Sequence, residues 1–243
     1  TEKNKLCKIQ LMNVPKIKFI LLACTALCFF LSSCIGNKPK ILIIGDSISM
    51  GYTTFVSKKL KKKARVYHNP KNAQHTGVGL KNINEWIKKE KWDIIQFNWG
   101  LWDMCYRTPE IKPPHNKDKT TGKITNNKYD YATNLDSIVA TIKKYSKAKL
   151  IFVTTTYVPE QDPGRYTSDV IAFNDTAKII MKKHAVSIND IHNQSIIVHE
   201  NFGKGVNDVH YFKEGYEQLS VLIASFLENQ LKKSSAVNSL RLK

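Results

Sequence analysis

The chain has 243 residues, of which 42% are hydrophobic and 24% are charged, and its formal net charge is +18. This length favours one domain, or at most two, with a substantial hydrophobic core. The positive excess comes mostly from scattered lysines, as in residues 58–63 and 88–91, which are typical of solvated helix faces. Because no basic and aromatic motif accompanies them, nucleic acid is excluded as the expected partner.

Residues 1–33 have the pattern of an N-terminal extension followed by an export signal. Met12 is the expected start of translation, and Lys16 and Lys18 form a positive segment behind it. Residues 19–31 are apolar without interruption, but the run is too short for a helix that spans a hydrocarbon core of about 30 Å. The segment therefore predicts a cleaved signal peptide.

A cysteine follows the apolar run directly. Residues 31–34 are Leu-Ser-Ser-Cys and resemble the lipobox of bacterial lipoproteins. This resemblance implies a lipidated tether at 34–40, with acyl chains on Cys34 that hold the protein on a membrane of the cell envelope (in a Gram-negative host the outer membrane, on its periplasmic or surface face). The alternative is an ordinary signal peptide with an incidental cysteine. After processing, Cys105 is the one free thiol, so we expect no disulfide and no cysteine metal site. We expect Cys105 to be a buried or half-buried structural cysteine, with a lone thiol nucleophile as the alternative.

Beyond the tether, apolar runs alternate with amphipathic runs. This alternation predicts a domain over residues 41–231, followed by a basic tail at 232–243. Strands that are apolar throughout and alternate with helices indicate an α/β fold whose parallel sheet is covered on both faces. The predicted strands cover 41–44, 65–68, 93–97, 150–154 and 185–188, and the predicted helices cover 49–63, 80–89, 129–145, 167–183 and 214–231.

Active sites of such sheets lie at the carboxyl ends of the strands. Ser47 follows the first predicted strand, residues 98–103 follow the third, and the loop at 154–165 follows the fourth. Residues 107–128 are polar and contain prolines, which predicts a long loop that serves a site or is mobile.

Ser47 lies where a buried strand breaks at Gly45 and a helix begins. A serine there has an exposed hydroxyl, and backbone N–H groups at the helix start can stabilise an oxyanion. The alternative is a plain turn and helix cap, since Asp and Ser are common residues both in turns and at helix caps. Far along the chain, His210 stands in a loop before the last predicted helix, where a neutral imidazole could take the serine proton.

These two segments resemble the outer motif blocks of the SGNH (GDSL-type) serine hydrolases. Gly-Asp-Ser-Ile at 45–48 resembles the first block, and Asn-Asp-Val-His at 207–210 resembles the last. The chain is also similar to a branch of the family with the motif N-W-G-L-x-D, here at 98–103. The resemblance implies a three-layer α/β/α, flavodoxin-like fold in which Ser47 is the nucleophile and His210 the base.

The middle blocks depart from the family pattern. Where the family has an oxyanion-hole glycine, this chain has Gln74, whose backbone N–H can still donate. Where it has an asparagine, this chain has Trp102, whose indole N–H is a candidate donor. The resemblance thus implies an oxyanion hole of Ser47, Gln74 and Trp102. Asn98 and Asp103 are further candidate site residues, although Asn98 could equally satisfy the local backbone.

The acidic partner of the histidine also differs. In the family it lies three positions before the histidine. Here that position is Asn207, and Asp208 is one residue nearer to His210. A carboxylate on Nδ1 fixes the tautomer and stabilises the imidazolium, whereas an amide does only the first. We therefore expect Asp208 to orient His210, with Asn207 as the alternative. Glu160 and Arg165 are candidates for substrate binding, although an exposed loop ion pair is the default expectation.

The resemblance implies ester hydrolysis through a Ser47 acyl-enzyme, by a monomer without cofactor or metal. The export signal and the polar loops favour short acyl (acetyl) esters on carbohydrate or another small molecule. A lysophospholipase or thioesterase is one alternative. A non-catalytic carbohydrate- or lipid-binding lipoprotein on the same scaffold is another, because Gln74, Trp102 and Asn207 differ from the family's residues.

Overall fold

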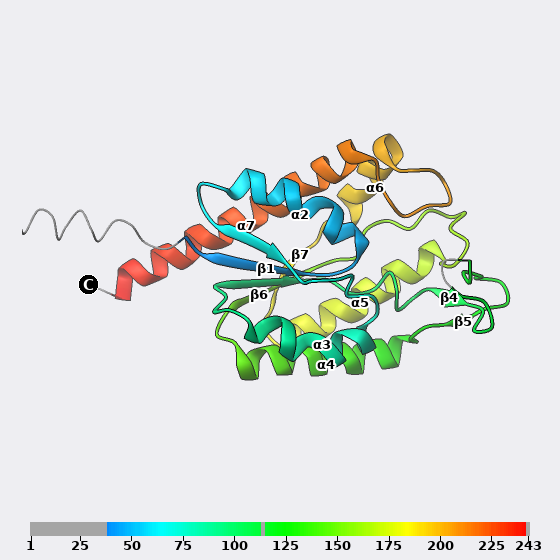
Figure 1. The fold of residues 1–243 in the computed structure, drawn as a ribbon, viewed down its shortest axis with the longest axis horizontal. Helices are drawn as coiled ribbons and strands as arrows, with labels where there is room; N and C mark the ends of the chain where they lie inside the picture. The colour runs from blue at the N-terminus through cyan, green and yellow to red at the C-terminus, as the bar shows by residue number, and fades with distance from the viewer. Residues whose placement is uncertain (1–37, 113–114, 242–243) are drawn as a thin grey trace, which may run out of the picture. The chain divides into compact units, whose positions relative to one another are not determined.

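Five parallel strands form the central sheet, in the order β2-β1-β3-β6-β7. The structure is a computed structural model that describes residues 38–112 and 115–241, with side chains up to 233. The signal segment and Cys34 therefore lie outside the described residues. All five predicted strands are present, within a few residues of their expected bounds (Figure 1). They are β1 (Lys40–Ile44), β2 (Arg65–His68), β3 (Ile94–Phe97), β6 (Lys149–Val153) and β7 (Ser187–Asn189).

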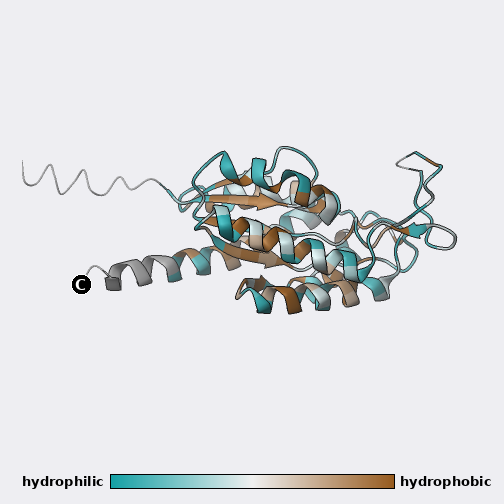
Figure 2. Ribbon diagram, turned by 90° about the horizontal axis from the view of Figure 1, so that it is seen from below, coloured by the Kyte–Doolittle hydropathy of each residue, from teal (hydrophilic) through white to brown (hydrophobic). Residues whose placement is uncertain are grey.

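The central strands are apolar on both faces because helices cover both faces. Every residue of β3 is buried, as is β1 from Ile41 onward. Figure 2 shows these strands as hydrophobic ribbons between helices that are hydrophilic on their outer sides. The continuous apolar runs in the sequence thus have a physical cause, since a strand covered on both faces has no side that water can reach.

The helices form two layers. One contains α2 and α6, which both pack on α7, and the other contains α3 and α5, which both pack on α4 (Figure 1). The α/β fold with three layers is therefore confirmed. The bounds are α2 (Ser47–Leu60), α3 (Thr76–Lys88), α4 (Lys128–Tyr145), α5 (Thr167–Lys183), α6 (His192–Phe202) and α7 (Lys213–Arg241).

Two of these helices differ from the sequence prediction. Helix α7 does not end at residue 231 but continues to Arg241, through most of the expected tail. Helix α6 was not predicted, because its apolar residues at 196–198 are adjacent and not spaced at a helical period. The side chains that it buries, Ser195 and His199, are polar. Hydrophobic periodicity cannot detect such a helix.

The segment predicted as a loop at 107–128 contains a little regular structure. Two short antiparallel strands, β4 (Tyr106–Arg107) and β5 (Lys123–Ile124), pair within it. Backbone N–H groups of residues 125 and 126 donate to carbonyls of residues 105 and 103. Cys105 is a free and buried thiol at the start of this segment. The hairpin is therefore tied to the loop that follows β3.

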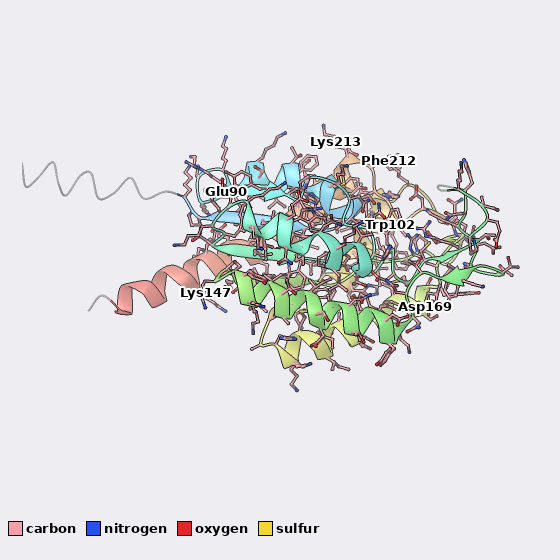
Figure 3. All side chains as sticks on the ribbon, turned by 60° about the horizontal axis from the view of Figure 1, so that its bottom comes forward. Glu90, Trp102, Lys147, Asp169, Phe212 and Lys213 are labelled. Carbon is pink, nitrogen blue, oxygen red and sulfur yellow. The ribbon has the colours of Figure 1, made fainter. Side chains whose placement is uncertain are left out.

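The sheet order places the candidate site. Strand β1 pairs with β2 on one side and with β3 on the other, so the direction of the chain connections reverses between β1 and β3. Ligand sites of open parallel sheets lie at such a switch point, outside the carboxyl ends of the strands. In Figure 3, Trp102, Asp169 and Phe212 lie toward that end of the sheet, whereas Glu90 and Lys147 lie toward the opposite end.

Candidate active site

Ser47 is the first residue of α2, directly after a tight turn from β1. Asp46 caps the helix, and its carboxylate accepts the Ile48 N–H at 2.9 Å. Gly45 precedes it, and a Cβ at that position would lie 2.8 Å from Ser49 Oγ. A side chain at position 45 would therefore crowd Ser49. As the first helical residue, Ser47 has a backbone N–H without an intrahelical acceptor.

The Asp46 carboxyl is almost fully buried, with an exposed fraction of 3%. Burial raises its pKa, and the Ile48 N–H together with the positive charge of Arg165 offsets part of this effect. The segment is therefore both a helix cap and a turn that presents a serine. Asp46 serves as the cap and leaves Ser47 at the surface of the turn.

A side chain that the sequence analysis missed anchors this turn from the neighbouring strand. Asn69, which follows β2, accepts the Gly45 N–H on its side-chain oxygen at 3.1 Å and is buried. Its position at the carboxyl end of a predicted strand was the only available signal. Asn69 thus ties the backbone before Ser47 to the edge of the sheet.

His210 lies in the loop between α6 and α7, and it faces Ser47. Its Nε2 is 2.9 Å from Ser47 Oγ, although the two residues are 163 positions apart in the sequence. The loop around it is held by main-chain bonds, among them one from the Lys204 N–H to the His210 carbonyl at 2.9 Å. The structure thus brings together the two residues that the outer motif blocks indicated.

Asp208 contacts the other ring nitrogen of His210. The Asp208 Oδ1 atom is 2.5 Å from Nδ1, and it also accepts the His210 backbone N–H at 3.0 Å. Partial burial by itself would raise the pKa of Asp208, but the two hydrogen bonds from His210, together with nearby charge that includes Lys117, lower it overall. Asn207, by contrast, is exposed. Asp208, and not Asn207, is therefore the residue that contacts the His210 ring.

His199, also missed by the sequence analysis, holds this loop from α6. Its Nε2 lies 2.7 Å from the Asp208 carbonyl oxygen and so donates to it. The imidazole stands between two tyrosines, with ring centroids at 5.4 Å from Tyr157 and 5.2 Å from Tyr211. Through this contact, the buried His199 positions Asp208, which in turn contacts His210.

The predicted oxyanion donor at Gln74 is engaged in this structure. Its N–H donates to the Asn72 side-chain oxygen at 2.8 Å, so this donor is not free. The backbone of Gln74 has a φ of 51°, in the left-handed region that favours glycine. Glycine would adopt this conformation without strain, so Gln74 carries a backbone cost that its residue type does not relieve.

Trp102 lies in the turn after β3 and carries a cation on its ring. The guanidinium carbon of Arg107 is 4.7 Å from the ring centroid, and Arg107 Nη1 donates to the Asn116 side-chain oxygen at 2.9 Å. Trp102 is partly buried and packs against the core. The hairpin segment thus fixes the orientation of the indole at the edge of the site.

The candidate donor Asn98 is likewise engaged. Its amide nitrogen donates to the Val153 carbonyl at 2.8 Å and to Thr155 Oγ1 at 3.3 Å. Both contacts go to the end of β6, so Asn98 joins two strand ends. These contacts correspond to the local backbone role, one of the two that the sequence left open for Asn98.

The candidate site residue Asp103 is buried, and its hydrogen bonds are to protein groups. Its Oδ1 accepts the Thr76 N–H at 2.9 Å, the Thr76 hydroxyl at 2.6 Å and the Asn126 amide at 2.7 Å. Burial raises the pKa of Asp103 to about 6, against the opposing effect of these bonds. Asp103 therefore joins the start of α3 to the loop before α4.

Arg165 is buried, with an exposed fraction of 3%, and its ion-pair partner is Asp162 at 3.1 Å. Its Nε also donates to the Leu101 carbonyl at 2.5 Å. The expected exposed ion pair between Glu160 and Arg165 is therefore wrong, because the loop turns Arg165 inward. Arg165 ties the loop after β6 to the turn after β3.

Within the described residues, no group of three or more His, Cys, Asp or Glu side chains could hold a metal ion. No helix of that part of the chain combines the length and the apolar character needed to cross a membrane.

Comparisons with known proteins relate this geometry to a known fold. No protein-family model matches the sequence, and no curated protein matches it. Among solved structures, the chain is similar to a lipase/acylhydrolase from Enterococcus faecalis, with 19% identity and a TM-score of 0.62 over 79% of this chain and 96% of that one. It is also similar to an acetylxylan esterase from Geobacillus stearothermophilus, with 18% identity and a TM-score of 0.60 over 81% of this chain and 95% of that one. The chain therefore shares its three-layer α/β fold with these proteins.

Proposed function

We propose that the protein is a serine ester hydrolase in which Ser47 is the nucleophile. The observation that carries this proposal is the chain of contacts from Ser47 Oγ to His210 Nε2 at 2.9 Å and from His210 Nδ1 to Asp208 at 2.5 Å. A nucleophile within hydrogen-bond reach of a base, with the base oriented by a third group, is the arrangement of serine hydrolases.

The direction of these hydrogen bonds follows from the Asp208 carboxylate. Because its pKa is lowered, it is ionised at neutral pH and only accepts hydrogen bonds. His210 Nδ1 must therefore carry the proton, and Nε2 presents its lone pair to the Ser47 hydroxyl. This tautomer is the one that can act as a general base.

The reaction follows from this tautomer. As Ser47 Oγ attacks the ester carbonyl, His210 Nε2 takes its proton, and the negative charge develops on the carbonyl oxygen. The free N–H of Ser47 at the start of α2 can donate to that oxygen. When the intermediate collapses, the alcohol leaves with the proton from Nε2, and water then hydrolyses the acyl-enzyme by the same steps.

We propose short acyl esters, such as acetyl esters on carbohydrate, as the substrates. The structural similarity to an acetylxylan esterase supports this choice. A lysophospholipase or thioesterase activity is the alternative within the same chemistry.

Labelling with a fluorophosphonate tests the function directly. The purified full chain should become modified on Ser47, as located by mass mapping, and should hydrolyse nitrophenyl acetate. Ser47→Ala should lose both properties and keep its melting temperature. Equal hydrolysis by wild type and Ser47→Ala would end the proposal.

A second candidate is a non-catalytic carbohydrate- or lipid-binding protein on this scaffold. The observation that favours it is that the N–H of Gln74 and the amide of Asn98 already have protein acceptors. Absence of labelling and of hydrolysis in the wild type would support this candidate.

We also propose that the mature protein is anchored in the cell envelope through acyl chains on Cys34. The support is the lipobox-like sequence alone. Full-length protein made in a bacterium should partition into detergent, and Cys34→Ser should not. Intact mass that shows no lipid would contradict the anchor.

A further inference from the structure

The lysines that are scattered along the sequence gather at one end of the folded domain. The connections from α2 to β2, from α3 to β3, from α4 to β6 and from α5 to β7 each lead to the amino end of a strand. Because these strands are parallel, the four connections lie at the same edge of the sheet. Figure 3 shows Lys147, from one of them, at the end opposite to Phe212. We define the basic end as the surface formed by residues 58–65, 88–93, 143–149 and 182–187.

The basic end has an excess of positive charge. Residues 58–65, 143–149 and 182–187 include lysine or arginine and no acidic residue, and residues 88–93 include two acidic residues among three lysines. Glutamates near this end form ion pairs, which are Lys40–Glu90, Lys63–Glu228 and Lys89–Glu85. The lysines outnumber these carboxylates, so a positive field remains at this surface.

The opposite end, where Ser47 and His210 lie, has no such excess. It is formed by Asp46 and by the loops at 69–75, 98–127, 154–166, 189–191 and 203–212. These segments together contain as many acidic as basic residues. The positive charge of the domain is therefore distributed along the direction of the strands, with the basic end on one side and the site on the other.

Helix stability accounts for only part of this charge. Cations in the last turn of a helix interact favourably with its dipole, and α2, α3, α4 and α5 all have lysines there. The effect falls off within that turn, but Lys62, Lys91 and Lys147 follow the helices and are exposed. Among the described side chains, none forms an ion pair with these three lysines. Their charge is available to a partner.

An aromatic side chain lies among the lysines of the basic end. Tyr145, the last residue of α4, is 49% exposed, and its ring centroid lies 4.7 Å from Lys88 Nζ and 5.2 Å from Lys144 Nζ. Tyrosine is enriched at membrane interfaces, where its ring meets the apolar region and its hydroxyl meets water. Lysines near such a surface are attracted to anionic head groups. This combination favours a lipid surface over a partner that offers charge alone.

The chain that leads from Cys34 enters the domain at the same end. Strand β1 begins at Lys40, six residues after Cys34. Six residues of extended chain span at most about 20 Å. Acyl chains on Cys34, as proposed above, would therefore keep the basic end within about 20 Å of the membrane that holds them.

We propose that the basic end binds the anionic phospholipid surface of this membrane and directs the site away from it. Ser47 is the first residue of α2 and Lys59 lies in its last turn, so at about 1.5 Å per residue the two are roughly 20 Å apart along the helix. Esters in the aqueous phase then reach Ser47, whereas lipids of the same leaflet lie beyond the basic end. The inference uses the proposed anchor only for the distance to the bilayer, and it does not depend on hydrolase activity.

Partition of the full chain carrying Cys34→Ser into vesicles measures the effect of charge without acyl chains. The vesicles contain phosphatidylcholine, with or without phosphatidylglycerol, and are separated by sedimentation. The apolar run at 19–31 contributes to both, so the ratio of the two partition coefficients reports the charge. This ratio should be on the order of 10³ at low salt and fall as salt is added. The added substitutions Lys62→Gln, Lys91→Gln and Lys147→Gln, made together, should lower it by about 10²-fold.

A matched control removes the same charge from the site end. Lys71→Gln, Lys112→Gln and Lys204→Gln, made together on exposed loops, should change the ratio by less than about threefold, because these lysines face away from the bilayer. Equal losses in the two triple variants would overturn the proposal, as would equal partition of the parent chain into both kinds of vesicle.

An acidic polysaccharide is the other partner that the positive charge permits, and Tyr145 distinguishes it from a bilayer. Tyr145→Ser should lower partition into both kinds of vesicle severalfold, because the ring no longer enters the interface. If Tyr145→Ser leaves vesicle partition unchanged and soluble polygalacturonate displaces the parent chain from the mixed vesicles, the surface binds acidic polysaccharide and the lipid assignment is wrong. Intact mass without lipid on Cys34 would refute the anchor, whereas the expected order of the variants would still support the basic end as a lipid-binding surface.

Discussion

The polar groups on the two sides of Ser47 differ in whether their partners suit the proposed catalysis. On the His210 side, each polar group has a partner that suits proton transfer, from Ser47 through His210 to Asp208. On the opposite side, the N–H of Gln74 is bound to Asn72 and the amide of Asn98 is bound to β6. The groups proposed for proton transfer are thus all in contact, while the proposed oxyanion hole has few donors without a protein acceptor.

In the proposed hydrolase, nucleophile activation and oxyanion stabilisation therefore depend on different segments of the chain. The first depends on two loops that meet across the switch point of the sheet. The second depends on the backbone conformation at Gln74 and on the turn at Trp102. Changes on each side should therefore have separable effects.

The largest effect is expected at Asp208. Asp208→Asn should lower kcat for nitrophenyl acetate by about 10⁴-fold, because the amide cannot stabilise the imidazolium and permits the wrong tautomer. Asn207→Ala, which removes an exposed side chain of the same loop, should cost about threefold or less. The reverse ranking of the two variants would show that Asn207 orients His210.

Trp102→Phe should have the next largest effect. It removes the indole N–H and keeps an aromatic ring under Arg107, so kcat should fall about 10²-fold if the indole donates to the oxyanion. KM should change little, because the donor acts in the transition state. Unchanged kcat with an unchanged melting temperature would leave the Ser47 N–H as the main donor.

Asp103 should affect stability and not chemistry. Its folded pKa of about 6 lies above the ordinary value of 3.8, so the folded state holds a proton that the unfolded state has released. Stability from this group is present below pH 3.8 and is lost as pH rises through 6. Between pH 4 and 7, the free energy of unfolding of wild type should fall relative to Asp103→Asn by on the order of 3 kcal/mol.

Denaturant titrations of both proteins across this pH range measure the difference. Parallel curves would show that Asp103 is ionised in the folded state throughout, with its charge stabilised by the donors from Thr76 and Asn126.

The smallest effect is expected at Gln74. Gln74→Gly should raise the free energy of unfolding by about 1 kcal/mol or less, because glycine adopts a φ of 51° without strain. Thermal unfolding measures this change. A loss of stability would mean that the Gln74 side chain contributes more than its backbone costs.

The sequence by itself determined the layered α/β fold and indicated two residues of the site, Ser47 and His210. The predicted strands are continuous apolar runs, and burial on both faces of a sheet requires this pattern. Ser47 was recognisable because Gly45 follows the apolar strand and Asp46 caps the helix that begins at Ser47. His210 was recognisable from its place before the closing helix. Each of these signals lies within a few residues of chain.

Only the tertiary structure decided which side chains meet. Whether Asp208 or Asn207 contacts His210 depends on the turn of a loop held by His199, and His199 lies on a helix without a hydrophobic period. The inward direction of Arg165 depends on Asp162 and on the Leu101 carbonyl from another strand end. Such contacts join segments that are distant in sequence, so no local pattern records them.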